Sequence, residues 1–394
     1  MGVGVTSDVS RLPILSMARR IAAFGLEDPE PLRVSEARWP ALLGVVVSQR
    51  LTGLAEVGIR EGWLRVSSAQ EAELIGRQRE AMLRSLAIER LLVRLATSLD
   101  EASVPFVVLK GAAVAHTAYP DPEWRPFGDL DILVRGQDWH HALGIVQNLG
   151  FRRDLPEPHR GFDVRFGKAA THTNEEGLQL DLHRMLTLGP FGLWIEPDEL
   201  FAGTTQLVLG GRRLRRLDDA SLFLHACVHA SLGWRPPLLL PLRDVVQIAT
   251  ALPVYRAVVI ERARDWRLGA VVHHAVATAS ELCGGTSGVL PRLVDGLVAG
   301  PRERRVLRAY TTGRRRRGGL ALSTVRAVPG LARKATYVRD MVLPSREFLT
   351  ARAHAGTARS SYARRWAVPF GWIAKEKGDV SKTEESDVRY RRHH

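Results

Sequence analysis

The sequence predicts an α+β protein in which a small α/β domain is followed by a mostly helical region. Residues 68–102 place apolar side chains at helical spacing. Between residues 104 and 186, short apolar runs that are typical of buried strands alternate with helical segments. From residue 218 to about 299 the apolar pattern is helical throughout. Strands that alternate with helices, followed by a region of helices alone, are typical of the α+β class.

The first long element is an amphipathic helix, "SAQEAELIGRQREAMLRSLAIERLLVRLATSLDEA", at 68–102. Ser68 and Glu71 match the spacing of a capping box, so we expect them to begin this helix. Its apolar stripe comprises Leu74, Ile75, Met82, Leu83, Leu86, Leu91, Leu92 and Leu95.

Three strands are predicted after this helix. They are "VPFVVLKG" (104–111), "GDLDILVR" (128–135) and "GLQLDLHRML" (177–186), and helices are expected at 112–119 and 137–151. The third strand alternates cleanly, with leucines on one face and Gln179, Asp181 and His183 on the other.

Two aspartates interrupt the apolar pattern of the second strand. Asp129 and Asp131 are two residues apart in "FGDLDILV", so their side chains share one face of a strand. Like charges at this spacing are costly unless a cation or a donor compensates them. Asp181 would bring a third carboxylate to the same place if its strand were a neighbour. The alternative is that the acids are solvated, or paired with the flanking Arg125 and Arg135.

Three carboxylates together indicate a site for hard divalent cations. Mg²⁺ takes oxygen ligands and commonly sits between carboxylates and substrate phosphates. Two such ions can stabilise the attacking and the leaving oxygen of phosphoryl or nucleotidyl transfer. We therefore predict that Asp129, Asp131 and Asp181 are metal ligands and catalytic residues.

The segment "LKGAAVAHTAYPDPEWRPFGDLDILV" (109–134) resembles the bacterial uncharacterised nucleotidyltransferase family, which belongs to the DNA polymerase β-like superfamily. The likeness covers about 70–370. Its further segments are "LDLHRML" (180–186), "LHACVHASLGWRPPLLLPLRDVVQI" (224–248), "VLPSREFL" (342–349) and "SSYARRW" (360–366).

The resemblance implies a mixed sheet with flanking helices and a transferase that moves an NMP group from an NTP to an acceptor hydroxyl, with two Mg²⁺ ions. By the same resemblance, Asp129 and Asp131 would bind the metals and the triphosphate. Asp181 would bind the catalytic metal and help to deprotonate the acceptor. The acceptor would be a small molecule, a peptide or a protein.

One motif departs from the superfamily, which usually has Gly-Ser or Gly-Gly opposite the triphosphate. This chain has Lys110-Gly111-Ala112 instead. Gly111 still permits close backbone approach to phosphate, and Lys110 can supply charge. We therefore expect Lys110 and Gly111 to bind the nucleotide.

Several further residues have two interpretations. Arg125 is predicted to touch phosphate, the alternative being a solvated loop arginine. His183 shares the face of Asp181 and would bind metal or acceptor, unless it makes a structural hydrogen bond. His225 and His229 are expected to have structural or acceptor-pocket roles. Asp244 would reach the cleft or, as we favour, pair with Arg243.

Five segments are expected along the chain. They are an N-terminal helical segment (1–67), the nucleotidyltransferase α/β domain (68–217), a helical domain (218–300), a basic helical region (301–374) and a disordered tail (375–394).

The net charge of +14 lies in the C-terminal quarter. Residues 301–394 hold 23 Lys and Arg against 8 Asp and Glu, a net of +15. A basic stretch of this kind predicts contact with a polyanion, either nucleic acid or an anionic membrane surface, unless it is simply a solvated face. One competing function is a non-catalytic nucleotide- or nucleic-acid-binding protein that uses this basic region. A related enzymatic alternative is terminal phosphoryl transfer to a peptide natural product.

The remaining composition points to a bacterial, cytoplasmic protein. Two cysteines exclude a disulfide framework and fit a reducing compartment. We expect no transmembrane segment, because no run approaches the roughly 18 apolar residues that are needed. The N-terminus lacks the pattern of a signal peptide.

Overall fold

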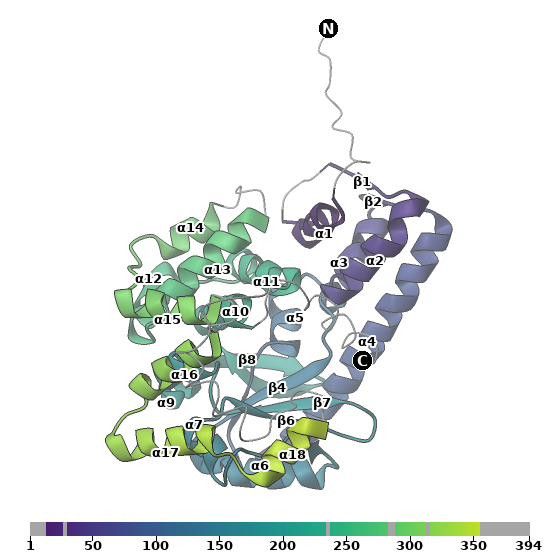
Figure 1. Cartoon of the computed structure of the whole chain (residues 1–394). Helices are drawn as coiled ribbons and strands as arrows, with labels where there is room; N and C mark the ends of the chain where they lie inside the picture. Colours follow the sequence, from purple (N-terminus) through teal and green to yellow (C-terminus); the bar gives the residue numbers. More distant parts are fainter. Residues whose placement is uncertain (1–12, 27–29, 234–236, 283–287, 312–315, 355–394) are drawn as a thin grey trace, which may run out of the picture.

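A computed structural model describes residues 13–26, 30–233, 237–282, 288–311 and 316–354. In Figure 1 the sheet lies at the centre, with α5 and the helices α10 to α14 above it and α6 below it, while α4 runs along one side. The described part holds no helix long and apolar enough to cross a membrane. The predicted tail at 375–394 and the segment at 360–366 lie outside the described residues.

The central sheet has seven strands in the order β5-β6-β7-β4-β3-β9-β8. It is mixed, as expected, because β4 pairs with β7 and β3 with β9 in parallel, while the other pairs are antiparallel. The strands are β3 (Phe106–Val108), β4 (Asp129–Val134), β5 (Arg152–Arg153), β6 (Ala169–Thr173), β7 (Gln179–His183), β8 (Thr204–Leu209) and β9 (Arg212–Leu217). The predicted strands at 104–111, 128–135 and 177–186 are confirmed as β3, β4 and β7.

Four strands, β5, β6, β8 and β9, were not predicted from the sequence. The hairpin of β8 and β9 turns at Gly210 and Gly211, which both have positive φ, as a two-residue hairpin turn requires. Its second strand reads "RRLRRL", so charged residues mask the usual apolar signal. β5 has only two residues, and β6 reads "AATHT", which is small and polar.

The helix α4 spans Ser68–Glu101, close to the predicted limits, but its N-cap residue lies one position before the predicted one. Ser67 is the N-cap residue, and its hydroxyl accepts from the Gln70 amide, while the Gln70 side chain accepts from the Ser67 amide. The prediction of Ser68 and Glu71 is therefore wrong. Ser67 has extended backbone angles, which an N-cap needs, and Ser68 is already helical.

This cap gives a first prediction. Ser67→Ala removes an acceptor from the first turn of α4 and is expected to lower the free energy of unfolding by about 1 kcal/mol. Urea denaturation would measure it, with Ser68→Ala as the matched control that leaves the cap intact. An equal loss in both variants would contradict the assignment of the cap.

The two faces of the sheet pack against different partners. Leu130, Ile132 and Val134 of β4 join a core with α4 and with α6 (Trp139–Asn148). The opposite face, which includes Val107 and Leu133, joins a larger core with α5 (Ala112–Ala118) and the helical region. By strand alternation, Asp129 and Asp131 lie on the same face as Leu133, toward the helical region.

The N-terminal segment packs into the same large core as the helical region. Its elements are α1 (Ile14–Ala23), β1 (Leu32–Arg33), η2 (Glu36–Arg38), α2 (Trp39–Ser48), α3 (Thr52–Arg60) and β2 (Leu64–Arg65), with β1 and β2 paired in parallel. Gly53 lets α3 approach the loop before β4, since a Cβ there would lie 2.2 Å from the carbonyl oxygen of Glu123.

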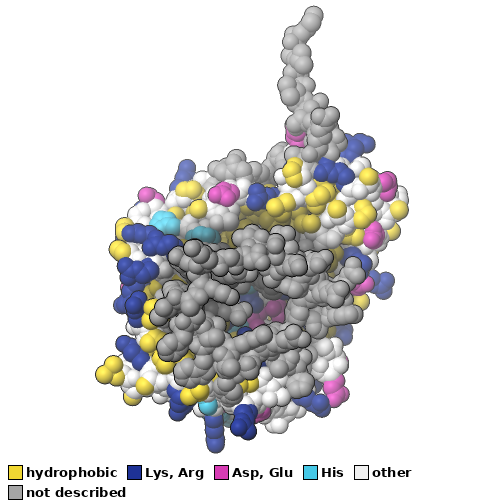
Figure 2. Space-filling view, in the orientation of Figure 1, with side chains coloured by type: hydrophobic (Ala, Val, Ile, Leu, Met, Phe, Trp, Pro, Cys, Tyr) yellow, Lys and Arg dark blue, Asp and Glu magenta, His cyan; other side chains and the backbone are white. Residues whose placement is uncertain are grey.

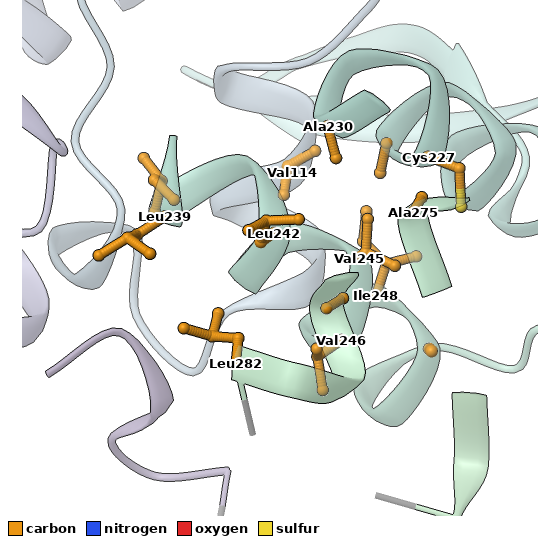
Figure 3. Packing of buried hydrophobic residues seen from close by; sticks show 14 of the residues in the cluster. Val114, Cys227, Ala230, Leu239, Leu242, Val245, Val246, Ile248, Ala275 and Leu282 are labelled. Atoms are coloured by element: carbon orange, nitrogen blue, oxygen red, sulfur yellow. The ribbon is translucent and has the colours of Figure 1, made fainter. Parts of the chain in front are cut away.

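The helical region begins at Asp219 and surrounds α11. Figure 3 shows Val114 of α5 beside Ala230 of α10, Leu242 and Val245 of α11 below them, and Cys227 of α10 near Ala275 of α13. The helices are α10 (Asp219–Leu232), α11 (Leu239–Ala251), α12 (Arg256–Asp265), α13 (Gly269–Leu282) and α14 (Val289–Val294).

The C-terminal helices return to the sheet. They are α15 (Pro301–Thr311), α16 (Arg316–Ala327), α17 (Leu331–Val342) and α18 (Arg346–His354). Tyr337 of α17 packs on Phe162 and Phe166 of α7 (Phe162–Phe166), the short helix before β6. The buried Asp340 accepts hydrogen bonds from Arg165 and Arg339. The remaining short elements are η3 (Pro122–Trp124), η4 (Gly136–Asp138), α8 (Gly189–Leu193) and α9 (Pro197–Ala202).

Candidate active site

The register between β4 and β7 brings the predicted carboxylates together. Asp131 pairs with Asp181, and Asp129 pairs with Gln179, in the parallel ladder. Neighbouring strands lie about 4.8 Å apart, so Asp131 and Asp181 are side by side on one face. The side chain of Asp131 is fully buried, while those of Asp129 and Asp181 are each 25% exposed. The expected clustering of the three acids is therefore present in the fold.

Lys110 supplies the cation that compensates these acids. Its Nζ lies 2.6 Å from Oδ2 of Asp131 and 3.8 Å from Oδ2 of Asp129. Burial alone would lower the pKa of Lys110, but the two carboxylates raise it above its ordinary value. Burial alone would raise the pKa of Asp131, but Lys110 and a hydrogen bond from His183 hold it well below its usual range.

His183 holds Asp131 from the other side. Its Nε2 lies 2.8 Å from Oδ1 of Asp131, and its Nδ1 lies 3.2 Å from the carbonyl oxygen of Met185. Both ring nitrogens are therefore engaged by neighbouring oxygens, and a ring held in this way orients the Asp131 carboxylate.

The residues present fit a divalent cation. Asp131, Asp181 and His183 each place a ligand atom within 4.8 Å of the others. Oδ1 of Asp181 is buried and has no hydrogen-bond partner among the described residues, so it is an oxygen whose lone pairs a cation would satisfy. Mg²⁺ prefers oxygen to nitrogen ligands, which favours the carboxylates over the imidazole.

Gly111 forms the turn between β3 and α5. Its φ of +61° belongs to the region that favours glycine. A Cβ at this position would lie 3.5 Å from the carbonyl oxygen of Asp129, so the glycine turn lies directly beside the first acid. The predicted nucleotide-binding pair Lys110 and Gly111 therefore adjoins the carboxylates.

Arg125 is engaged in a buried ion pair. Its Nε and Nη2 donate to Oδ1 and Oδ2 of Asp244 at 2.9 and 2.7 Å, and Tyr119 donates to Oδ1 at 2.9 Å. A further contact of 3.4 Å joins Nη1 of Arg125 to the carbonyl oxygen of Gly111. The expected phosphate contact of Arg125 remains a prediction.

The favoured pairing of Asp244 with Arg243 is wrong, because the Asp244 carboxylate is bound by Arg125 and Tyr119. Arg243 turns to the other side of α11, where it donates to Gln247 and to the carbonyl oxygens of Ala22 and Phe24. Adjacent residues on a helix point about 100° apart, so neighbours in sequence rarely meet.

Lys168, which lies just before β6, was not predicted as a site residue. Burial and the charge of Lys110 lower the pKa of Lys168, whereas Asp131 and Asp181 act in the opposite direction. The backbone carbonyl of Lys168 accepts from the amides of Arg184 and Met185, which fixes this turn at the end of β7. The apolar pattern of β6 is weak, so this strand could not be predicted from the sequence. Lys168 is near the acids because β6 pairs with β7 in the sheet.

His225 and His229 of α10 lie across from the sheet. The charges of Lys110 and Asp131 act on both imidazoles. Burial and Lys110 lower the pKa of His225 to about 3 and the pKa of His229 well below its ordinary value. His225 is 3% exposed, and its Nδ1 has no hydrogen-bond partner among the described residues. Both rings are therefore neutral at physiological pH.

These neutral histidines predict a loss of stability in mild acid. The unfolded chain takes up the proton near pH 6.5, whereas folded His225 does not until about pH 3, so stability falls as the pH drops below 6.5. We expect His225 alone to remove about 2 kcal/mol between pH 6.5 and pH 5, at about 1.4 kcal/mol per pH unit. Urea denaturation at several pH values would measure it.

The control for this prediction is His225→Gln, which does not titrate. Its stability should fall less steeply over the same range. A slope identical to that of the unmodified protein would show that His225 is not the residue responsible.

A mixed sheet with carboxylates on one face is compatible with a transferase, and the family match shows that the chain is a nucleotidyltransferase. The model of the uncharacterised nucleotidyltransferase family matches residues 35–284, and the chain belongs to this family. The family resemblance is thereby confirmed, and the bacterial origin remains a prediction.

The chain also resembles solved structures at low sequence identity. The antibiotic-resistance factor ANT(2'')-Ia in solution is 16% identical, with a TM-score of 0.34 over 48% of this chain and 97% of that chain. An antigenic nucleotidyltransferase-like protein from Paracoccidioides brasiliensis is 13% identical, with a TM-score of 0.35 over 52% and 91%. The lincomycin-bound lincosamide adenylyltransferase LnuA is 13% identical, with a TM-score of 0.29 over 41% and 96%. No curated protein matches the chain.

Proposed function

We propose that this protein is a Mg²⁺-dependent nucleotidyltransferase that moves an NMP group from an NTP, such as ATP, to an acceptor hydroxyl. The observation that carries the proposal is the pairing of Asp131 with Asp181 on adjacent strands, with Asp129 on the same face. Carboxylates arranged in this way suit divalent ions that bridge to a triphosphate.

Asp129, Asp131 and Asp181 would hold the metal. When bound, Mg²⁺ supplies charge stabilisation at the phosphoryl oxygens and lowers the pKa of the attacking hydroxyl. His183 keeps Asp131 oriented, and Lys110 balances its charge in the absence of metal. Lys110, Gly111 and Lys168 adjoin the acids on the side where phosphates would lie.

The acceptor oxygen forms a bond to the α-phosphorus while the bond from that phosphorus to the bridging oxygen of the β-phosphate breaks. Asp181 receives the hydroxyl proton, and pyrophosphate leaves. Asp181 suits this role because it is partly exposed and one of its oxygens has no partner among the described residues, whereas both oxygens of Asp131 are engaged.

The test uses α-³²P-labelled NTPs with Mg²⁺ and cell extract, in parallel with the variant Asp181→Asn. Transfer of label to an acceptor by the unmodified protein alone would support the proposal and would identify the donor base. Label that appears only from γ-³²P-NTP would instead establish terminal phosphoryl transfer. Neither product, from folded protein with metal, would overturn the proposed reaction.

The basic C-terminal helices remain a proposed contact for polyanions. In Figure 2, Lys and Arg side chains gather on the edge that holds α12, α15 and α17. Several of these arginines have partners within the protein, since Arg302 lies over the ring of Trp194 and Arg304 donates to the carbonyl oxygen of Ala299. The four-arginine run at 314–317 falls partly outside the described residues.

A further inference from the structure

A pocket of about 510 Å³ has Asp129 among its lining residues. This volume is within the range of small-molecule binding sites. Its walls come from the turn between α2 and α3, from one side of α4 and from the starts of β4 and β7. The lining residues with charged or apolar side chains are Val47, Arg50, Arg77, Glu80, Ala81, Arg84, Pro126, Phe127 and Asp129.

The pocket carries positive charge that the protein does not neutralise. Arg77 lies 3.5 Å from Glu80, and Lys110 lies 3.8 Å from Asp129, so both acids of the pocket have a basic neighbour. Arg50 and Arg84 have no carboxylate partner among the described residues. Two guanidinium groups are thus available to a ligand a short distance from the predicted metal site.

Arg84 is held in place by the backbone of the active-site strands. Its Nε donates to the carbonyl oxygen of Gly128 at 2.9 Å, and its Nη2 donates to the carbonyl oxygen of Gly177 at 3.0 Å. A Cβ on Gly128 would lie 3.2 Å from this Nε, so the glycine leaves room for the arginine against the start of β4. These two bonds leave further N–H groups of the fork free to bind an anion.

Arg50 has a backbone conformation that glycine adopts more easily than other residues. Its φ is +59°, in the turn between α2 and α3. A non-glycine residue in this region costs of order 1 kcal/mol or more, which favours a role for the side chain. The turn is anchored, because Gly53 packs on Glu123 and the Arg60 guanidinium donates to the Glu123 carboxylate at 2.6 Å.

We propose that this pocket binds the acceptor, and that the acceptor carries a carboxylate or phosphate group next to an apolar portion. This inference rests on the proposed nucleotidyl transfer. Guanidinium forks bind both oxyanions in a bidentate manner, and Val47, Ala81 and Phe127 provide an apolar wall. Asp129 is one of the lining residues, so an acceptor in this pocket would lie beside a predicted metal ligand. The N-terminal helices therefore form part of the substrate site.

The test is a calorimetric titration with phenyl phosphate and with benzoate, which separate the two oxyanions on the same apolar ring. Neutral benzamide is the matched control ligand. Mg²⁺ and a non-hydrolysable ATP analogue are present at saturation, so that anions cannot enter the nucleotide site. We expect at least one anion to bind at least about tenfold more tightly than benzamide.

The variants are Arg50→Gly, which relieves the positive φ, and Arg84→Gln. Each is expected to weaken anion binding by about tenfold or more. Arg79→Gln, on the same helix but outside the pocket, should leave binding unchanged. Unaltered binding in both pocket variants would overturn the proposal, as would the absence of anion binding to the unmodified protein. Binding that occurs only without the ATP analogue would assign the pocket to the nucleotide and also overturn it.

This titration needs no turnover, so its result is separate from that of the labelling experiment. If label transfer occurs, the same two variants should raise the KM for the acceptor by about tenfold, with a smaller change in kcat. A loss of kcat with no change in KM would contradict an acceptor role. Anion binding without any label transfer would remove the acceptor assignment together with the proposed function.

Discussion

Asp181→Asn is expected to reduce nucleotidyl transfer by at least about 10³-fold while the protein keeps most of its stability. The loss follows because the amide removes one ligand charge and the proton acceptor, and metal-assisted charge stabilisation is worth several kcal/mol, with each 1.4 kcal/mol a factor of ten in rate. The fold should tolerate the change, since the side chain is 25% exposed and Lys110 pairs with Asp131 rather than with Asp181. Rates with α-labelled NTP and urea denaturation would measure both quantities.

Asp131→Asn is the informative comparison. It should lose activity and stability together, because the amide leaves the mostly buried Lys110 without the closer of its two carboxylate partners. Asp265→Asn, on the exposed surface of α12, is the matched control that should change neither. An active Asp181→Asn protein would remove Asp181 from the proposed mechanism.

Arg125→Ala is expected to cost about 3–5 kcal/mol of folding free energy, the largest stability effect of any single change considered. It leaves the Asp244 carboxylate buried without its guanidinium partner, and breaking a buried pair from one side typically costs this much. The pair joins the loop before β4 to α11, so the expected result is a looser contact between the sheet and the helical region. Urea denaturation would measure the loss.

The double variant Arg125→Met/Asp244→Leu tests whether the lost stability comes from an unpaired buried charge or from lost side-chain packing. Removing both charges avoids an unpaired buried charge, but the buried Tyr119 hydroxyl loses its acceptor, so this protein should recover part of the lost stability. If the double variant is as unstable as Arg125→Ala, the burial of an unpaired charge is not the cause. If it is stable but inactive, the contact of Arg125 with Gly111 serves the reaction rather than the fold.

The elements with clean periodicity could be predicted from sequence. The long helix α4, the strands β3, β4 and β7, and the shared face of Asp129 and Asp131 follow from local spacing, because burial imposes a period of 3.6 or 2 on apolar residues. The outer strands could not be predicted in the same way. In "RRLRRL" of β9 the arginines dominate the composition, and only pairing with β3 and β8 makes the segment a strand.

The functional groups could be identified from the sequence alone: three carboxylates and a lysine next to a glycine, in strands that the apolar pattern indicates. Which of these residues are in contact depends on how the strands and helices pack. Only the parallel register places Asp131 opposite Asp181, and only the sheet order brings Lys168 to them. The partner of Asp244 and the pocket at Arg50 and Arg84 also depend on segments far apart in the chain. Contacts between distant segments are set by packing and pairing of whole elements, for which local spacing carries no signal.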